Sequence, residues 1–210
     1  SISHGLLACL PVRSVVTTNY DCLYEMAFRL PRKELRHGGS LTVLPYNVAN
    51  NPKNQWILKI HGCVTNPSDI VLTRSDYIRY SDRRAALAGI AQALLITKHM
   101  LFVGFSLNDD NFHRIMDAVR LSLPKENQRR LGTSFNLHAI TMQEELWRSE
   151  VKVVPMGGPD GPDSPSIPIL ARRLEICLDH LTALCTTETP FLLSLRFRGV
   201  VSRPDQMISE

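Results

Sequence analysis

Four apolar stretches of this chain each run directly into residues that offer hydrogen bonds, proton transfer or close backbone approach. Asparagine, histidine, aspartate and serine side chains supply the first two, and glycine permits the third because it has no Cβ. The groups are 17–21 (Thr-Thr-Asn-Tyr-Asp), His61-Gly62, Gly104-Phe105-Ser106 and Met156-Gly157-Gly158. If the apolar stretches are parallel strands, all four groups meet at one sheet edge, where α/β folds bind ligands.

The first group has the most informative surroundings. Val15-Val16 precedes it, and a helical pattern follows, expected from Asp21 to about Leu30. Asp21 or Asn19 could cap that helix by accepting hydrogen bonds from its first N–H groups. On spacing alone, an ordinary strand–turn–helix corner with capping residues is the better explanation, because such caps are common. The apolar positions that share one helical face are Tyr20, Leu23, Tyr24, Ala27 and Phe28.

Predicted strands alternate with predicted helices along most of the chain. This order is typical of an α/β fold with a mostly parallel sheet flanked by helices. The predicted strands are 14–16, 56–60, 100–103, 135–140, 151–154 and, more weakly, 191–197. Residues 41–46 are either a short strand or an extended connection, and 70–73 are a further short extended run. One predicted helix ends at Leu10, and the others cover 21–30, 75–77, 81–95, 109–119, 143–149 and 170–184. Residues 155–168 are predicted to be a loop, because they are rich in glycine and proline.

Composition excludes several classes of protein. The 210 residues carry a net charge of +4, without a basic run interleaved with aromatic residues, so we expect no nucleic-acid partner. No apolar run reaches membrane-spanning length, so we expect no membrane partner. The five cysteines are widely spaced, which argues against structural zinc and favours an intracellular, cytoplasmic location. Cys177 and Cys185 are predicted to be small core residues.

Three motifs in order resemble a known family. They are Thr-Thr-Asn-Tyr-Asp at 17–21, Leu-Lys-Ile-His-Gly at 58–62 with Ile-Val-Leu-Thr-Arg-Ser-Asp-Tyr at 70–77, and Leu-Phe-Val-Gly-Phe-Ser-Leu-Asn-Asp at 101–109. The series resembles the sirtuin-like NAD-consuming domain, in the branch of NAD hydrolases of antiviral defence rather than the deacetylases. The resemblance implies a Rossmann-like three-layer fold with NAD as substrate or ligand.

The resemblance also implies roles for individual residues. Asn19 matches the catalytic asparagine that positions the nicotinamide ribose and the attacking water. His61 matches the catalytic histidine, which bonds a ribose hydroxyl and can act as general base. Thr18 and Asp21 are expected to bind the cofactor, Asp21 at the nicotinamide amide. Gly104 and Ser106 match the Gly-x-Ser turn that binds the cofactor through its backbone and hydroxyl.

Two departures from the family pattern affect the expected function. The deacetylases carry a four-cysteine zinc module after the His-Gly motif, whereas only Cys63 lies there in this chain. We therefore expect no metal and no protein deacylation. The family's first strand and glycine-rich, pyrophosphate-binding turn are also not recognisable, so residues 1–185 are interpreted as a sirtuin-like domain that is partial at its N-terminus. Residues 186–210 are interpreted as a tail or the start of another segment.

Three functions remain open from the sequence. The first is an NAD glycohydrolase in the intact protein, with Asn19 and His61 catalytic. The second is a catalytically silent module that binds NAD or a derivative and signals or assembles with copies of itself. The third, protein deacylation, is disfavoured by the missing zinc module. The sequence leaves hydrolysis and cyclisation of NAD unresolved.

Overall fold

Two parallel three-stranded sheets form the centre of the molecule. The structure is a computed structural model that describes residues 2–29, 40–47, 54–124, 129–139, 141–159, 161 and 164–186. The first sheet has the order β1-β3-β2 and the second has the order β4-β5-β6, with every pairing parallel. Their bounds are β1 Ser14–Thr17, β2 Thr42–Leu44, β3 Trp56–Lys59, β4 Met100–Val103, β5 Gly132–Asn136 and β6 Val151–Pro155.

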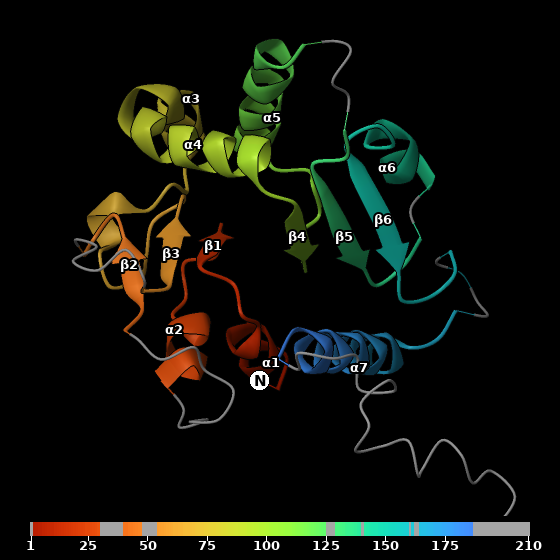
Figure 1. Cartoon of the computed structure of the whole chain (residues 1–210). Helices are drawn as coiled ribbons and strands as arrows, with labels where there is room; N and C mark the ends of the chain where they lie inside the picture. Colours follow the sequence, from red (N-terminus) through yellow and green to blue (C-terminus); the bar gives the residue numbers. More distant parts are fainter. Residues whose placement is uncertain are drawn as a thin grey trace, which may run out of the picture.

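Helices cover both faces of these sheets, and Figure 1 shows α3, α4 and α5 on one side and α1, α2 and α7 on the other. This is the predicted Rossmann-like α/β arrangement, which the structure confirms. The helices are α1 Ile2–Cys9, α2 Leu23–Arg29, α3 Arg74–Ile78, α4 Tyr80–Thr97, α5 Asp110–Ser122, α6 Thr141–Leu146 and α7 Ile167–Thr186, with a short 3₁₀ turn, η1, at Pro67–Asp69.

Successive residues of a strand point to opposite faces, so the second sheet packs against two separate apolar clusters. Phe102 lies in the first cluster, and Val103 packs against the second. The first cluster joins α4 and α5 to the fully buried Trp147, and the second joins α1 and α7 to Phe135. The predicted apolar stripe of α5 is confirmed, because Phe112, Ile115, Met116 and Val119 are all buried.

Of the predicted extended stretches, one pairs with no strand and another is displaced. Residues 70–73 form no strand; they follow η1 and lead into α3, whose N-cap Thr73 forms a capping box with Asp76. The strand predicted at 135–140 lies at Gly132–Asn136, where it pairs with both β4 and β6. Gly132 permits this pairing, because a Cβ there would lie 2.5 Å from the Met100 carbonyl oxygen.

The prediction that both late cysteines are core residues was half wrong. Cys177 is half-buried and packs against the second cluster, whereas Cys185 is exposed near the end of α7. The strand predicted at 191–197 lies outside the described residues. Within the described residues, no helix has both the length and the apolar character needed to span a membrane.

Candidate active site at the strand ends

The turns that follow β1 and β3 are tied together by backbone hydrogen bonds. The Ile60 N–H donates to the Thr17 carbonyl over 3.1 Å, and the Val64 N–H donates to the Tyr20 carbonyl over 2.9 Å. Because the two strands are parallel neighbours, the Asn19 turn and His61 lie at the same sheet edge. The sequence prediction that these two groups share an edge is confirmed.

His61 is buried, with 2% of its surface exposed, in a polar and aromatic environment. Its Nε2 lies 3.3 Å from Asn111 Nδ2 and 3.5 Å from Asp109 Oδ2. The rings of Tyr77 and Tyr80 pack edge-on against the imidazole, with centroids 5.6 and 6.0 Å away. The β3 end and the start of α5 are thus joined through one histidine, which has both an amide and a carboxylate within reach.

Asp109 has two structural roles in this arrangement. Its Oδ1 accepts a hydrogen bond from the Phe112 N–H over 2.9 Å and so caps α5. Its Oδ2 faces His61. Burial raises the pKa of the Asp109 carboxyl, but the His61 contact and the Phe112 and Asn111 N–H groups outweigh it, and the pKa is lowered overall. A stable carboxylate therefore stands beside the imidazole.

The turn between β4 and α5 is held in an unusual backbone conformation. Gly104 has φ +63°, which glycine adopts freely, but Leu107 has φ 59°, which is strained for a residue with a branched side chain. Leu107 is completely buried in the first apolar cluster, and this burial compensates for the strain. Gly104 and Ser106 remain exposed on the same turn, and the Ser106 Oγ accepts a hydrogen bond from the Asn108 N–H over 3.4 Å.

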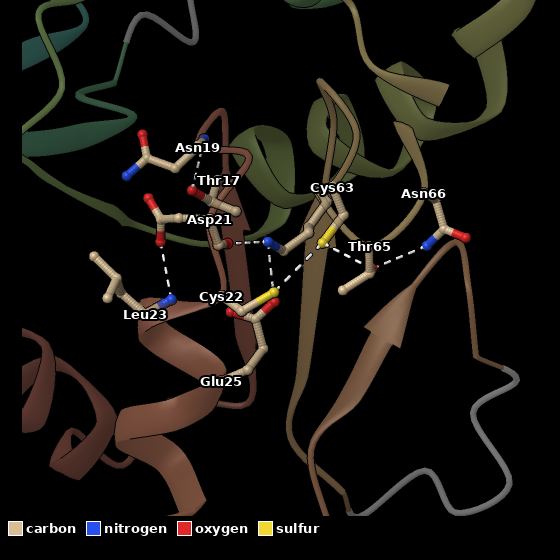
Figure 2. Close-up of polar contacts among 10 residues, drawn as sticks. Thr17, Asn19, Asp21, Cys22, Leu23, Glu25, Cys63, Thr65 and Asn66 are labelled. Atoms are coloured by element: carbon tan, nitrogen blue, oxygen red, sulfur yellow. Dashed lines mark hydrogen bonds and ion pairs between the residues drawn. The ribbon is translucent and has the colours of Figure 1, made fainter. Parts of the chain in front are cut away.

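The predicted ligand-contacting residues of the first turn are accessible to different degrees. Asn19 is exposed, and its N–H donates to Thr17 Oγ1 over 3.0 Å, which fixes the turn. Figure 2 shows its side chain directed away from Cys63. Asp21 Oδ1 accepts from the Leu23 N–H over 2.9 Å at the start of α2, so Asp21, rather than Asn19, makes the predicted capping contact. Thr18 is half-buried.

The fourth predicted group, which follows β6, lies at the same edge of the second sheet as Gly104, because β4, β5 and β6 are parallel, but β5 separates the two groups. Met156 packs in the second apolar cluster, and its carbonyl accepts a hydrogen bond from Arg173 of α7. A Cβ on Gly157 would meet the Leu170 side chain at 2.6 Å, so this glycine allows α7 to approach the strand end. The described contacts give this group a packing role and do not join it to His61.

Gly62 is the one position of the site where only glycine fits. It has φ +95°, and a Cβ there would lie 2.4 Å from the Asp69 carbonyl oxygen. We expect Gly62→Ala to destabilise the domain by about 1–3 kcal/mol or more, because backbone strain and a backbone clash coincide. Urea unfolding measures the change. Gly89→Ala in α4 is the control, since its Cβ meets nothing within 4 Å; equal losses in both variants would contradict the explanation.

A buried charged cluster lies between the end of β3 and the start of α2. Lys59, with 0% of its side chain exposed, places its Nζ 3.0 Å from Glu25 Oε1 and also donates to the Asp21 carbonyl. Cys22 and Cys63 adjoin it, with their sulfur atoms 3.6 Å apart (Figure 2). The potential ligand atoms of Cys22, Glu25 and Cys63 lie within 4.8 Å of one another. Lys59 disfavours a metal ion at these atoms, because its ammonium group already neutralises the Glu25 carboxylate.

Several of these residues could not be predicted from the sequence. The position of Asn111 and the Asp109–His61 contact depend on how α5 packs against β3, and local sequence patterns do not predict that packing. Lys59 had a usable signal, because a charge inside the apolar stretch Trp-Ile-Leu-Lys-Ile must find a partner when the strand is buried. Glu25 on α2, the helix that follows β1, is that partner.

The parallel α/β fold, with a histidine at one strand end and an Asn-containing turn at the next, is that of a SIR2-like domain. A model of the SIR2-like domain matches residues 13–151, and the chain belongs to this family. Among curated relatives, the NAD(+) hydrolase ThsA of Enterococcus faecium is 39% identical over 131 residues, covering 61% of this chain and 27% of the relative.

Two further relatives show the range of the similarity. The NAD(+) hydrolase ThsA of Bacillus cereus is 33% identical over 129 residues, covering 60% of this chain and 26% of the relative. The defense-associated sirtuin 2 of Bacillus subtilis is 26% identical over 120 residues, covering 56% of this chain and 12% of the relative. The similarity therefore spans about a quarter of the NAD(+) hydrolases and less of the defense-associated sirtuin.

Proposed function

We propose that this domain, in its intact protein, cleaves the nicotinamide–ribose bond of NAD and releases nicotinamide and ADP-ribose. The observation that carries the proposal is the meeting of the β1, β3 and β4 ends around His61. There the imidazole lies beside Asp109 and Asn111. The similarity to proteins named NAD(+) hydrolases supports the same reaction.

The residue types suit this reaction. Nicotinamide leaves as a neutral base, so the bond breaks with positive charge developing on the ribose, and water adds at that carbon. Asn19 would position the water and the ribose, which is the kind of orientation that lowers the entropic part of a barrier. His61 would hold a ribose hydroxyl and accept a proton. The Asp109 carboxylate would orient the imidazole and stabilise its protonated form.

The remaining predicted contacts complete the proposed site. Gly104 and Ser106 would bind the cofactor through the backbone and hydroxyl of the exposed turn after β4. Thr18 and Asp21 would bind it at the β1 turn, where Asp21 already caps α2. Because His61 is only 2% exposed, contact with ribose requires the side chains around the imidazole to rearrange. A substrate held there is screened from bulk water, which protects it from solvent while the electrostatic contacts act.

A silent NAD-binding or self-assembling module is the second candidate. The exposed turn of Gly104 and Ser106 could bind a dinucleotide whether or not His61 takes part in chemistry. Self-association into homo-oligomers belongs to this candidate as well. Turnover distinguishes it from the hydrolase, because a silent module binds NAD and releases no nicotinamide.

Nicotinamide release from NAD by the intact protein and by this chain tests the proposal. We expect Asn19→Ala to lower the rate roughly 100-fold, because the attacking water loses its orientation while the exposed side chain leaves the fold intact. Asn54→Ala is the matched control, since Asn54 lies just before β3, at the opposite end of that strand. Tight NAD binding by the intact protein without nicotinamide release would leave the silent module as the better description.

A further inference from the structure

We propose that Cys22 and Cys63 form a peroxide-sensitive dithiol, which closes to a reversible disulfide between the turns that follow β1 and β3. This modification site is independent of whether the domain cleaves NAD. The proposed reaction gives neither of these cysteines a role.

The geometry brings the two sulfur atoms together from distant parts of the chain. They are 41 residues apart in sequence and 3.6 Å apart in space, and Figure 2 shows both side chains pointing at each other. A disulfide requires a sulfur–sulfur distance of about 2.05 Å. Closing the gap therefore needs a shift of about 1.5 Å, shared between the two turns. Cys22 is half-buried and Cys63 is buried, so small molecules reach the pair from the side of Cys22.

The polar contacts around the pair shift the pKa values of the two thiols in opposite directions. Thr65 Oγ1 lies 3.2 Å from Cys63 Sγ, as a hydrogen-bond donor. Burial raises the pKa of the Cys63 thiol, but hydrogen bonds from Thr65 and Cys22 and the Lys59 ammonium lower it overall. Burial, the Cys63 contact and the Glu25 charge raise the pKa of Cys22. Cys63 is thus the better thiolate, and Cys22 is the thiol that resolves the oxidised form.

The same cluster argues against a resident metal ion. Glu25 supplies the third potential ligand atom, but its Oε1 is 3.0 Å from Lys59 Nζ. The lysine also donates to the Asp21 carbonyl, so it cannot leave without breaking a buried hydrogen bond. A divalent cation would have to share this space with a buried ammonium group. The charge of Lys59 instead favours a thiolate, which is the state that reacts with peroxide.

The reaction balances with a hydroperoxide as the oxidant. The Cys63 thiolate attacks one peroxide oxygen, the O–O bond breaks, and Cys63 becomes a sulfenic acid while the leaving hydroxide or alkoxide takes a proton. Cys22, as its thiolate, then attacks the Cys63 sulfur; the S–O bond breaks and water leaves after protonation. The two thiols together lose two electrons, which the peroxide accepts, and one S–S bond is formed.

Closure would fix the relative position of the two turns that hold Asn19 and His61. Cys22 follows Asp21 directly, and Cys63 lies two residues after His61. The segment between the cysteines contains β2 and β3. The cross-link therefore closes this segment into a loop and lowers the conformational entropy of the unfolded chain. We expect oxidation to raise the melting temperature by roughly 5–10 °C.

Peroxide titration of the reduced full chain tests the proposal. After treatment with hydrogen peroxide and alkylation of the remaining thiols, tryptic digestion should join peptides 14–29 and 60–74, each of which contains one cysteine. Dithiothreitol should restore both thiols and reverse the rise in melting temperature. In Cys22→Ser, dimedone should label Cys63 as a trapped sulfenic acid, and Cys185→Ser, at an exposed site, should still form the disulfide.

Three outcomes would overturn the proposal. The first is that Cys22 and Cys63 both stay alkylatable while other cysteines oxidise. The second is that Cys63 of the parent chain accumulates as a sulfinic acid instead of pairing. The third is that the reduced chain binds one equivalent of zinc through dialysis with both thiols protected, which would assign the cluster as a metal site. The half-buried Cys22→Ser variant keeps the test usable if a Cys63 variant fails to fold.

Discussion

His61→Ala should lower the rate of nicotinamide release from NAD by roughly 10²–10⁴-fold in the intact protein, the usual contribution of a general acid–base group. The imidazole is the group on which Asp109, Asn111 and two tyrosine rings converge. In the proposed mechanism, its removal takes away the proton acceptor and the partner of the ribose hydroxyl. The loss should appear mainly in kcat, because contacts to the rest of the dinucleotide remain.

The control for this variant is His99→Ala. His99 is exposed, directly precedes β4 and hydrogen-bonds Oγ1 of Thr133, the second residue of β5, over 2.9 Å. It lies at the opposite strand ends from those that carry the proposed site, so its loss should leave turnover within about twofold, in line with a surface substitution. Equal activity of His61→Ala and the parent chain, with both folded by circular dichroism, would remove His61 from the proposed mechanism.

Lys59→Met should destabilise the domain by about 3–5 kcal/mol, the usual cost of removing one partner of a buried ion pair. The side chain of Lys59 has no solvent exposure, and Glu25 has almost none. The variant leaves the Glu25 carboxylate buried without its ammonium partner, and it also leaves the Asp21 carbonyl without a donor. Urea unfolding under reducing conditions measures the change.

The double variant Lys59→Met/Glu25→Gln separates charge from packing. Removing both charges should recover most of the stability lost in the single variant, because no uncompensated charge remains. Full recovery is not expected, since the Asp21 carbonyl still lacks the lysine. If the double variant loses more free energy of unfolding than the two single variants lose together, the pair does not act through charge neutralisation. Arg120→Met, which breaks a partly exposed pair with Glu150, is the surface control.

The sequence was sufficient for the fold class and for the pairing of the first two site groups. Alternation of apolar strands with amphipathic helices specifies a parallel α/β arrangement, and parallel pairing brings the residues after β1 and β3 to one edge. The buried stripe of α5 was predicted correctly because each of its members follows helical spacing. These features depend only on periodicity and chain order.

The errors arose where tertiary contacts override local preference. Residues 70–73 have strand-forming side chains, but the Val71 backbone bonds the His61 carbonyl and the Tyr20 hydroxyl instead of a strand. β propensity measures fit to a pleated surface and does not name the partner. Likewise Asn111 became part of the His61 environment only through the angle at which α5 meets β3. The position of 132–136 depended on pairing with two neighbouring strands.

Leu107 links the thermal behaviour of the core to that of the proposed site. Its strained backbone is held only because its side chain is buried among the aromatic residues of the first cluster, and Asp109 is two residues away. When the packing of that cluster loosens, nothing compensates for the unfavourable backbone conformation of Leu107. The turn then relaxes, and the Asp109 carboxylate moves away from His61. The proposed NAD cleavage should therefore fall at a lower temperature than helix content. The domain would then switch off by partial softening, before the chain unfolds.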